Sequence, residues 1–288
     1  IPILMNSKAG ALKVGGGLDQ MRRLVESVGV EAEVIATDTP EQMRAEIRRL
    51  VGAKAPVVAV AGGDGTIGRV VGEFAHQDTA LAIIPQGTFN NFATALRLPA
   101  DLPTALRVLH DGQVLEVSLG RIGDHYFTEV AGVGLFADAL ALYGSGTNKN
   151  FFRGVLAMLR VFFAMRPRRI RLFLDGEQVE ERAVWTTVAN SYRMAQGLPI
   201  APGARLTDDH LDVIVVGDLR RREFIPYYRA IRAQLHRELP KVAAYQAREI
   251  RIETRRPMNV HADDAVVAVT PVTIKVEPRA LKVMVDRL

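Results

Sequence analysis

The sequence contains no cysteine, which excludes disulfide bonds, thiolate catalysis and zinc or iron–sulfur sites built on cysteine. It also lacks a long apolar run. The most apolar stretch, near residues 155–165, is interrupted by Arg160 and is far shorter than the ~20 residues that span a bilayer. We find no secretory signal, internal repeat or low-complexity segment. These absences predict a soluble, cytoplasmic protein.

What the chain does contain is typical of a globular protein. Its 288 residues are 48% hydrophobic and 24% charged, which is enough apolar material for roughly two domains, each with its own core. The formal net charge of +5 favours anionic partners, such as nucleotides, phosphorylated metabolites, acidic lipid surfaces or nucleic acid.

Strand and helix patterns alternate through the first third of the chain. Strand patterns at 1–5, 31–36, 57–61 and 81–84 are interleaved with helical patterns at 16–29, 39–51, 67–75, 90–97 and 102–111. Thr39 and Pro40 suit the N-cap and first turn of the second helix. The alternation predicts an α/β domain with an open, mostly parallel sheet, whose ligands lie beyond the carboxyl ends of the strands.

Strand patterns follow one another from about residue 113, which predicts a second, β-rich, sandwich-like domain. They lie at 114–121, 125–131, 170–174, 183–189, 211–216, 249–253, 257–262, 272–276 and 281–285, with helical insertions at about 151–165 and 222–239. Asp175 and Gly176 form a hairpin-turn signal between two of these strands. The predicted domains are 1–117 and 118–288.

A glycine-rich loop, GGDGT, joins a buried strand to a helix within residues 57–71. Gly62 and Gly63, just past the strand, permit positive φ and close approach of a ligand, and amides at a helix start form a phosphate site. The loop matches neither the Walker motif nor GxGxxG. Asp64 beside phosphates would ligate Mg²⁺, accept a hydrogen bond from ribose or water, or orient the loop. The alternative is a plain turn with Asp64 as N-cap.

Two other polar loops follow predicted strands at the same sheet edge. The stretch PQGTFNN, residues 85–91, places Asn90 and Asn91 in a first helical turn, where they would cap the helix or hold phosphate oxygens. The stretch NSK, Asn6 to Lys8, would add donors and a cation, although a lone exposed lysine is usually just solvated. Three such loops at one edge favour a phosphate site over three ordinary turns.

These motifs together resemble the diacylglycerol kinase catalytic-domain family, which includes bacterial diacylglycerol and YegS-like lipid kinases and sphingosine and ceramide kinases. The ordered set is NSKAG, GGDGT and PQGTFNNFA. Residues 188–216 are similar to the family's segment ending in Asp-Asp-Gly-x-Leu-Asp, and residues 260–285 to its closing Asp-Gly-Glu segment followed by TPVT. GGDGT alone is shared with NAD kinases, whereas the ordered set, which covers nearly the whole chain, is more specific.

The resemblance implies an ATP-dependent lipid kinase. The first domain would bind ATP, the second would complete the site, and the lipid hydroxyl would enter the cleft between them, with the terminal strand near 279–288 packed back on the first domain. The implied phosphate-binding residues are Gly62, Gly63, Gly65 and Thr66, then Gly87, Thr88 and Asn90, then Asn6, Ser7 and Lys8. The resemblance gives Asp64 the role of organising nucleotide and Mg²⁺.

Asp263 takes the place of the family's catalytic aspartate. A carboxylate hydrogen-bonded to the acceptor hydroxyl can orient it and accept its proton; the alternative is a turn between two edge strands. The family's Asp-Gly-Glu is here Asp263-Asp264-Ala265, so the glutamate is missing, and Gly68-Arg69 replaces a common Asn-Glu pair. These departures put an altered substrate or weak activity among the expectations.

The resemblance also implies a structural Mg²⁺ site, which some bacterial members hold through one aspartate and nearby carbonyls. The corresponding residues are Asp209 and the carbonyls of Leu206 and Leu211, with His210 in place of glycine.

Residues 149–171 combine cations with apolar side chains and contain no acid. The cations are Lys149, Arg153, Arg160, Arg166, Arg168, Arg169 and Arg171, interleaved with phenylalanines and leucines. This pattern suits an interfacial helix on an anionic membrane surface; the alternative is a packed helix with solvated arginines. For the helix near 220–241 we expect a solvated face, because Glu223 and Glu238 offset its cations. No motif for reading nucleic acid is present.

The leading hypothesis is therefore an ATP-dependent kinase of a diacylglycerol-like or sphingoid lipid, cytoplasmic and peripherally associated with the membrane. The alternatives are an NAD kinase-like enzyme and a non-catalytic nucleotide- or lipid-binding protein, the latter motivated by Ala265 and Arg69. The sequence names neither the lipid nor the oligomeric state.

Overall fold

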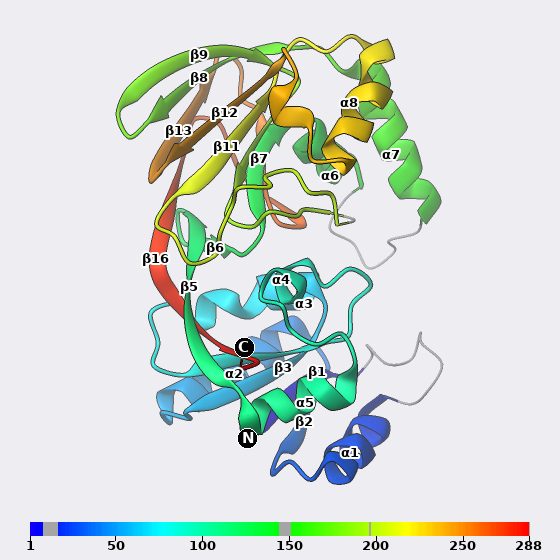
Figure 1. The fold of residues 1–288 in the computed structure, drawn as a ribbon, viewed down its shortest axis with the longest axis vertical. Helices are drawn as coiled ribbons and strands as arrows, with labels where there is room; N and C mark the ends of the chain where they lie inside the picture. Colours follow the sequence, from blue (N-terminus) through cyan, green and yellow to red (C-terminus); the bar gives the residue numbers. More distant parts are fainter. Residues whose placement is uncertain (8–16, 144–150, 196, 288) are drawn as a thin grey trace. The chain divides into compact units, whose positions relative to one another are not determined.

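The computed structural model describes residues 1–7, 17–143, 151–195 and 197–287. The chain divides into two compact units, one formed by Ile1–Leu119 with Pro278–Leu288 and the other by Gly120–Glu277. Figure 1 shows the elements of both units, coloured along the sequence.

The first unit is built on a parallel sheet in the order β2-β1-β3-β4. Its strands are β1 (Pro2–Asn6), β2 (Glu33–Thr37), β3 (Val57–Gly62) and β4 (Ala80–Pro85), and the end of β16 (Val272–Val285) pairs parallel with β4. All of β4 and nearly all of β3 are buried, as is typical of parallel strands.

Helices connect these strands. They are α1 (Gly17–Val28), α2 (Pro40–Gly52), α3 (Asp64–Val70) with the 3-10 turn η1 (Val71–Glu73), α4 (Asn91–Ala95) and α5 (Leu102–Asp111). In α2 the buried residues Met43, Ile47 and Leu50 recur at helical spacing. The hydroxyl of Thr39 accepts a hydrogen bond from the Gln42 amide at 3.2 Å, so the predicted N-cap is confirmed.

The second unit contains an antiparallel six-stranded sheet in the order β12-β11-β10-β7-β14-β15. In chain order these strands are β7 (Val130–Gly134), β10 (Trp185–Ala189), β11 (Leu211–Val216), β12 (Val242–Ala247), β14 (Asn259–Ala262) and β15 (Ala265–Val269).

A further group of strands joins β9-β8-β13 to the start of β16. These are β8 (Arg168–Leu174), β9 (Glu177–Ala183) and β13 (Glu249–Thr254), while β5 (Gln113–Ile122) pairs with β16 and with the short β6 (His125–Phe127). Side chains from both groups, such as Val213, Leu172 and Ile252, meet in one buried cluster. This is a β-sandwich, so the predicted α/β first domain and β-rich second domain are both confirmed.

Helices cover the other side of the six-stranded sheet. They are α6 (Leu135–Tyr143), α7 (Phe151–Ala164), and α8 (Phe224–Arg232), which lies between the 3-10 turns η2 (Arg221–Glu223) and η3 (His236–Glu238). Trp185 and Ile214 of the sheet share a buried cluster with Tyr227 and Ile231 of α8. Among the helices in the described part of the chain, none combines the length and apolarity needed to cross a bilayer.

Several elements of the second unit differ from the sequence patterns. β16 is one continuous strand, whereas two strands were predicted around Pro278, a residue without an amide hydrogen. The predicted helix at 222–239 is the shorter α8, because Gln234 takes a left-handed φ of 60°. The helix α6 and the strands β9, β12 and β15 were not predicted.

Candidate active site

The parallel strands of the first unit end together at one edge of the sheet. Asn6 of β1 lies opposite Thr37 of β2, Met5 opposite Ala61 of β3, and Gly62 opposite Pro85 of β4. From β1 the chain continues to β2 on one side of the sheet, whereas from β3 it continues to β4 on the other side. The direction of the strand order therefore reverses between β1 and β3. Open α/β sheets bind their ligands at such a point.

The two glycine loops at this edge touch each other. A Cβ added to Gly87 would lie 2.6 Å from the Cα of Gly63, and one added to Gly63 would lie 2.7 Å from the Cα of Gly87. Real Cβ atoms do not approach backbone this closely, so the contact requires glycine at both positions. The loops are also joined by a hydrogen bond from the Gln86 amide to the Gly62 carbonyl, at 3.0 Å.

Asp64 and Asn90 hold these loops in place. The Asp64 Oδ1 accepts a hydrogen bond from the Phe92 amide at 3.2 Å, so a residue of the first glycine loop caps the helix that follows the second. Asn90 has a left-handed φ of 50°, accepts from the Gly87 amide at 2.8 Å and donates to the Gly87 carbonyl at 3.2 Å. Asp64 was considered above as a Mg²⁺ ligand, as a hydrogen-bond acceptor for ribose or water, or as a residue that orients the loop. The hydrogen bond from the Phe92 amide supports the last of these roles.

The loop after β1 is tied to the end of β2. The Ser7 amide donates to the Thr37 carbonyl at 2.8 Å, and the Ser7 hydroxyl donates to the Asp38 carboxylate at 2.5 Å. Asp38 was not among the predicted site residues, although it directly follows the strand β2. Lys8 lies outside the described residues.

Asp263, in the second unit, is bound by four donors. Its Oδ2 accepts from the Thr128 amide at 3.0 Å and the Thr128 hydroxyl at 3.1 Å, and its Oδ1 accepts from the amides of Glu129 and Val130 at 2.9 and 3.1 Å. Its own amide donates to the Val130 carbonyl at 2.8 Å. The side chain therefore fastens the turn between β14 and β15 to the start of β7.

Burial raises the pKa of Asp263 to about 6, while the hydrogen bonds from Thr128, Glu129 and Val130 act in the opposite direction. The neighbouring His261 is buried, and desolvation lowers its pKa to about 4, so this imidazole is neutral at physiological pH. A carboxyl that titrates near pH 6 is ionised at neutral pH and remains basic enough to accept a proton.

The turn itself shows what replaces the expected Asp-Gly-Glu. Ala262 pairs with Ala265, which leaves Asp263 and Asp264 as the two turn residues, and Asp263 takes a left-handed φ of 46°. Asp264 is exposed. Ala265 stands where the family's Asp-Gly-Glu motif has its glutamate, and its side chain is only a methyl group. This position therefore supplies no carboxylate.

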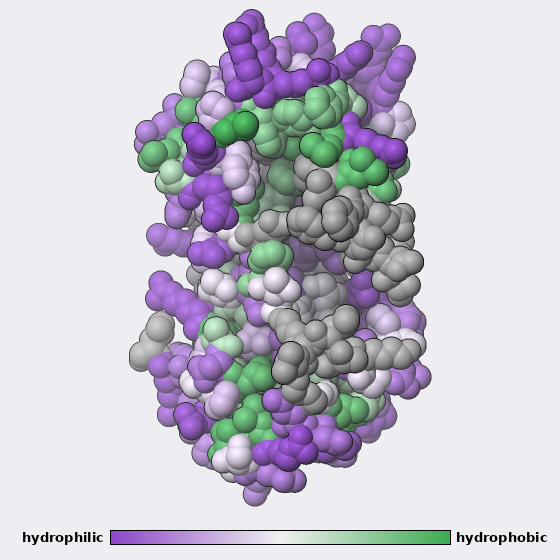
Figure 2. Space-filling view, turned by 90° about the vertical axis from the view of Figure 1, so that its right-hand side faces the viewer, coloured by the Kyte–Doolittle hydropathy of each residue, from purple (hydrophilic) through white to green (hydrophobic). Residues whose placement is uncertain are grey.

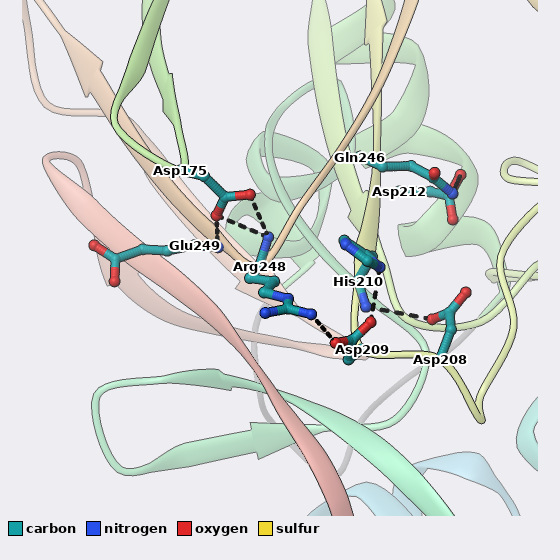
Figure 3. A network of polar contacts seen from close by, with 8 residues as sticks. All are labelled: Asp175, Asp208, Asp209, His210, Asp212, Gln246, Arg248 and Glu249. Carbon is teal, nitrogen blue, oxygen red and sulfur yellow. Dashed lines mark hydrogen bonds and ion pairs between the residues drawn. The ribbon is translucent and has the colours of Figure 1, made fainter.

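The predicted metal ligand Asp209 lies in a polar network, shown in Figure 3. Its carboxylate contacts the Arg248 guanidinium and lies 3.0 Å from His210 Nδ1. Asp175 accepts hydrogen bonds from the amides of Arg248 and Glu249 and so fixes the backbone at Arg248. Burial raises the pKa of two neighbouring carboxyls, those of Asp208 in the loop and Asp212 in β11.

This arrangement does not fit a bound Mg²⁺ as it stands. A metal ion on Asp209 would compete with Arg248 for the same oxygens, and a guanidinium already balances the carboxylate charge. Among the described residues, no three His, Asp or Glu side chains are grouped as a metal centre. A magnesium ion held by Asp209 with the carbonyls of Leu206 and Leu211 stays a prediction, and no step below depends on it.

Two family models account for nearly the whole chain. The model described as the diacylglycerol kinase catalytic domain matches residues 1–122, and the one described as the YegS C-terminal NAD kinase beta sandwich-like domain matches residues 137–285, just over half of the chain. This chain belongs to the diacylglycerol kinase family. The family resemblance based on the motifs is thereby confirmed.

Individual relatives of this diacylglycerol kinase family member agree with the assignment. A diacylglycerol kinase of Staphylococcus haemolyticus is 27% identical over 245 residues, covering 83% of this chain and 74% of the relative. One of Staphylococcus carnosus is 26% identical over 267 residues, covering 91% and 87%. A crystal structure of a diacylglycerol kinase from Bacillus anthracis matches the fold with a TM-score of 0.75 at 20% identity, covering 99% of this chain and 96% of that one.

Within this family member, the structure brings the predicted phosphate loops together at one sheet edge and places Asp263 in the second unit. The sequence interpretation missed the partners of Asp263. Thr128 and Glu129 are both buried, and the Glu129 carbonyl accepts from the amides of Asn190 and Ser191 at 2.9 and 3.0 Å. The available signal was the polar pair Thr128-Glu129 inside an otherwise apolar strand pattern.

Proposed function

We propose that this chain is an ATP-dependent lipid kinase. It transfers the γ-phosphate of magnesium-bound ATP to a hydroxyl of a diacylglycerol-like or sphingoid lipid. The observation that carries the proposal is the contact between the two glycine loops at the reversal point of the first sheet. Relatives that match across most of the chain are named diacylglycerol kinase, which supports a lipid as the acceptor.

The first unit would hold the nucleotide. Backbone amides of the two glycine loops, at Gly62 to Thr66 and Gly87 to Asn90, would face the phosphates, with Asn6, Ser7 and Lys8 at the neighbouring strand. The Gly87 amide is already used by Asn90. The Thr66 amide likewise already donates to the Gly63 carbonyl, at 2.9 Å. The donors for phosphate oxygens would therefore be the remaining loop amides and the hydroxyls of Thr66 and Thr88.

The transfer step is an in-line displacement. The lipid oxygen forms a bond to the γ-phosphorus while the bond from that phosphorus to the β-phosphate oxygen breaks, and ADP leaves. The hydroxyl proton of the lipid goes to Asp263, whose pKa of about 6 keeps it ionised and ready to accept a proton at neutral pH.

The hydrogen bonds of Asp263 determine how it receives that proton. An ionised carboxylate has about four acceptor positions, and four donors already occupy them. Three of these donors are backbone amides, which cannot move without the strand. The Thr128 hydroxyl can rotate, so we expect the lipid hydroxyl to take its place on Oδ2.

A membrane partner follows from the substrate, because the acceptor lipid resides in a bilayer. The basic and apolar segment at 149–171 supports contact with an anionic membrane surface, and peripheral association is part of the proposal.

A non-catalytic nucleotide- or lipid-binding protein is the second candidate. It is favoured by the fully occupied Asp263 carboxylate and by Ala265 in place of the family's glutamate. Nucleotide binding seen by calorimetry, without turnover of any lipid, would support this candidate over the first.

Transfer of radiolabel from ATP to a panel of diacylglycerol, sphingosine and ceramide tests the proposal. We expect one class to be labelled, and Asp263→Asn to abolish the label. NAD in the same panel tests the NAD kinase alternative. If no lipid is labelled while ATP still binds, the kinase proposal is wrong.

A further inference from the structure

Large exposed apolar side chains gather on the helices of the second unit. Of the eleven such residues in the described part of the chain, six lie on α7, on α8 or just after α8: Leu156, Leu159, Phe163, Ile225, Tyr228 and Leu235. Figure 2, which views the molecule from the right-hand side of Figure 1, shows hydrophobic residues grouped in its upper part with hydrophilic ones above them. Exposed apolar groups of this kind mark interaction surfaces.

On α7 the apolar residues share one exposed face. Leu156, Leu159 and Phe163 stand at helical spacing and are 50%, 47% and 60% exposed. Val161, on the opposite face, is buried against the sheet. The helix thus carries apolar side chains on the face toward the core and also on the exposed face. A helix that only covers a core has a polar exposed face.

The same arrangement recurs on α8. Ile225 and Tyr228 are 62% and 44% exposed, whereas Tyr227 and Ile231 pack into the core. The sequence pattern predicts a solvated face for this helix. The face is exposed, and it carries large apolar side chains between its arginines.

Contacts between the helices make the two faces one surface. The rings of Phe162 and Phe224 meet edge to face with centroids 5.0 Å apart. The Arg221 guanidinium donates to the Phe163 carbonyl near the end of α7 and lies 5.8 Å from the Phe163 ring. Figure 1 shows α7 and α8 side by side.

The charge on this surface is positive. Exposed arginines lie on or beside both helices: Arg160 and Arg166 at α7, and Arg222, Arg229 and Arg232 at α8. Among the described residues, none of these five has a carboxylate within ion-pair distance. Glu223 of η2, the one acid within residues 221–232, is paired with Lys241 at 2.6 Å.

We infer that α7 and α8 together form a docking face for an anionic lipid bilayer, which we call the α7/α8 face. Its apolar side chains would enter the interface while its arginines contact acidic headgroups, the combination that binds peripheral proteins to membranes. The inference deepens the proposed function and rests on it for its biological purpose, because a kinase of bilayer lipids must reach its acceptor.

Vesicle binding tests the face directly. Sedimentation is measured without ATP, so that no lipid is phosphorylated, on vesicles of phosphatidylcholine alone or mixed with phosphatidylglycerol. We expect binding to the mixed vesicles. The triple variant Arg222→Gln, Arg229→Gln, Arg232→Gln should bind them on the order of 100-fold more weakly. A variant with Arg22, Arg23 and Arg107 each changed to Gln has the same net charge and should bind like the parent.

The apolar part has its own variants. Ile225→Ser and Tyr228→Ser should each weaken binding about tenfold, whereas Val114→Ser, which removes a side chain 52% exposed on β5 of the first unit, should have no effect. Because all these residues are exposed, we expect the melting temperatures of the variants to be unchanged. This measurement shows whether the variants fold.

The outcomes separate this inference from the kinase proposal. Vesicle binding without phosphorylation of any lipid would leave the α7/α8 face standing and remove the kinase function. Phosphorylation of detergent-dispersed lipid without vesicle binding would remove the face and keep the kinase. The inference would be overturned if the two charge-matched triple variants lost vesicle binding equally. It would also be overturned if the protein bound no vesicles and formed a dimer that Ile225→Ser disrupts.

Discussion

Replacing Thr128 by valine removes one of the four hydrogen bonds that Asp263 accepts, and the effect can be worked out from the structure. The Thr128 hydroxyl donates to Asp263 Oδ2 at 3.1 Å, while the three backbone donors remain after the substitution. A hydrogen bond to the ionised carboxylate lowers its pKa, so the loss of that bond raises it.

The size of the change follows from the strength of such a bond. A hydrogen bond to a charged group contributes about 1.5–3 kcal/mol, and about 1.4 kcal/mol corresponds to one pH unit. We therefore expect the pKa of Asp263 to rise from about 6 to about 7–8 in Thr128→Val. Activity needs the ionised carboxylate, so the acid limb of the rate profile should move to higher pH by the same amount.

The pH dependence of kcat/KM and kcat, measured separately on the labelled lipid, checks this. The kcat/KM profile reports the free enzyme and should shift. The kcat profile reports the bound complex, in which the lipid hydroxyl has already replaced the Thr128 hydroxyl, and should stay in place. Thr128→Ser keeps the hydroxyl and should keep both profiles.

Thr187→Val is the matched control, because its buried hydroxyl has no hydrogen-bond partner in the described part of the chain and does not touch Asp263. An acid limb near pH 6 that is the same in all four proteins would refute the assignment of Asp263 as the group that titrates. If the acid limb of the kcat profile shifted together with that of the kcat/KM profile, the lipid hydroxyl would not replace the Thr128 hydroxyl in the bound complex.

Gly87→Ala should weaken ATP binding at least tenfold in calorimetry, because its Cβ would lie 2.6 Å from the Gly63 Cα, while Gly52→Ala, where a Cβ meets nothing within 4 Å, should not. Removing divalent cations with EDTA should leave the melting temperature unchanged, since Arg248 already pairs with Asp209; a drop would show that a bound metal ion stabilises the fold. Arg248→Gln should cost under about 1 kcal/mol, because the pair is exposed. Lowering the pH to about 5 should cost about 2 kcal/mol of unfolding free energy through His261, whose pKa falls from about 6.5 unfolded to about 4 folded. The neutral imidazole stabilises the fold fully above pH 6.5 and progressively less below it, so in urea unfolding His261→Gln should show less of this loss.

The parallel sheet of the first unit could be predicted because its signals are local. Buried strands such as Val57–Gly62 are short apolar runs, and Thr39 followed by Pro40 marks a helix start wherever it occurs. The glycine loops follow strands in the sequence, and parallel strands place their carboxyl ends at one edge. Neighbouring residues therefore sufficed to predict that the loops would share that edge.

The surroundings of Asp263 could not be predicted in this way. Its partners at 128–130 are more than 130 residues away in the chain, and pairing of β7 with β14 brings them together. Nothing near Asp263 in the sequence indicates that its carboxylate is already fully hydrogen-bonded. The apolar side chains on the exposed face of α8 could not be predicted for a similar reason, because only the packing of Tyr227 and Ile231 decides which side of the helix remains outside.

The close approach of Gly63 and Gly87 has a consequence for how this protein can vary. The two positions compete for one small volume, so a side chain at either one forces the same separation of the backbones. Changing both to alanine should therefore harm nucleotide binding hardly more than changing one. A mutation at one of these sites would not be repaired by a smaller residue at the other, because glycine is already the smallest.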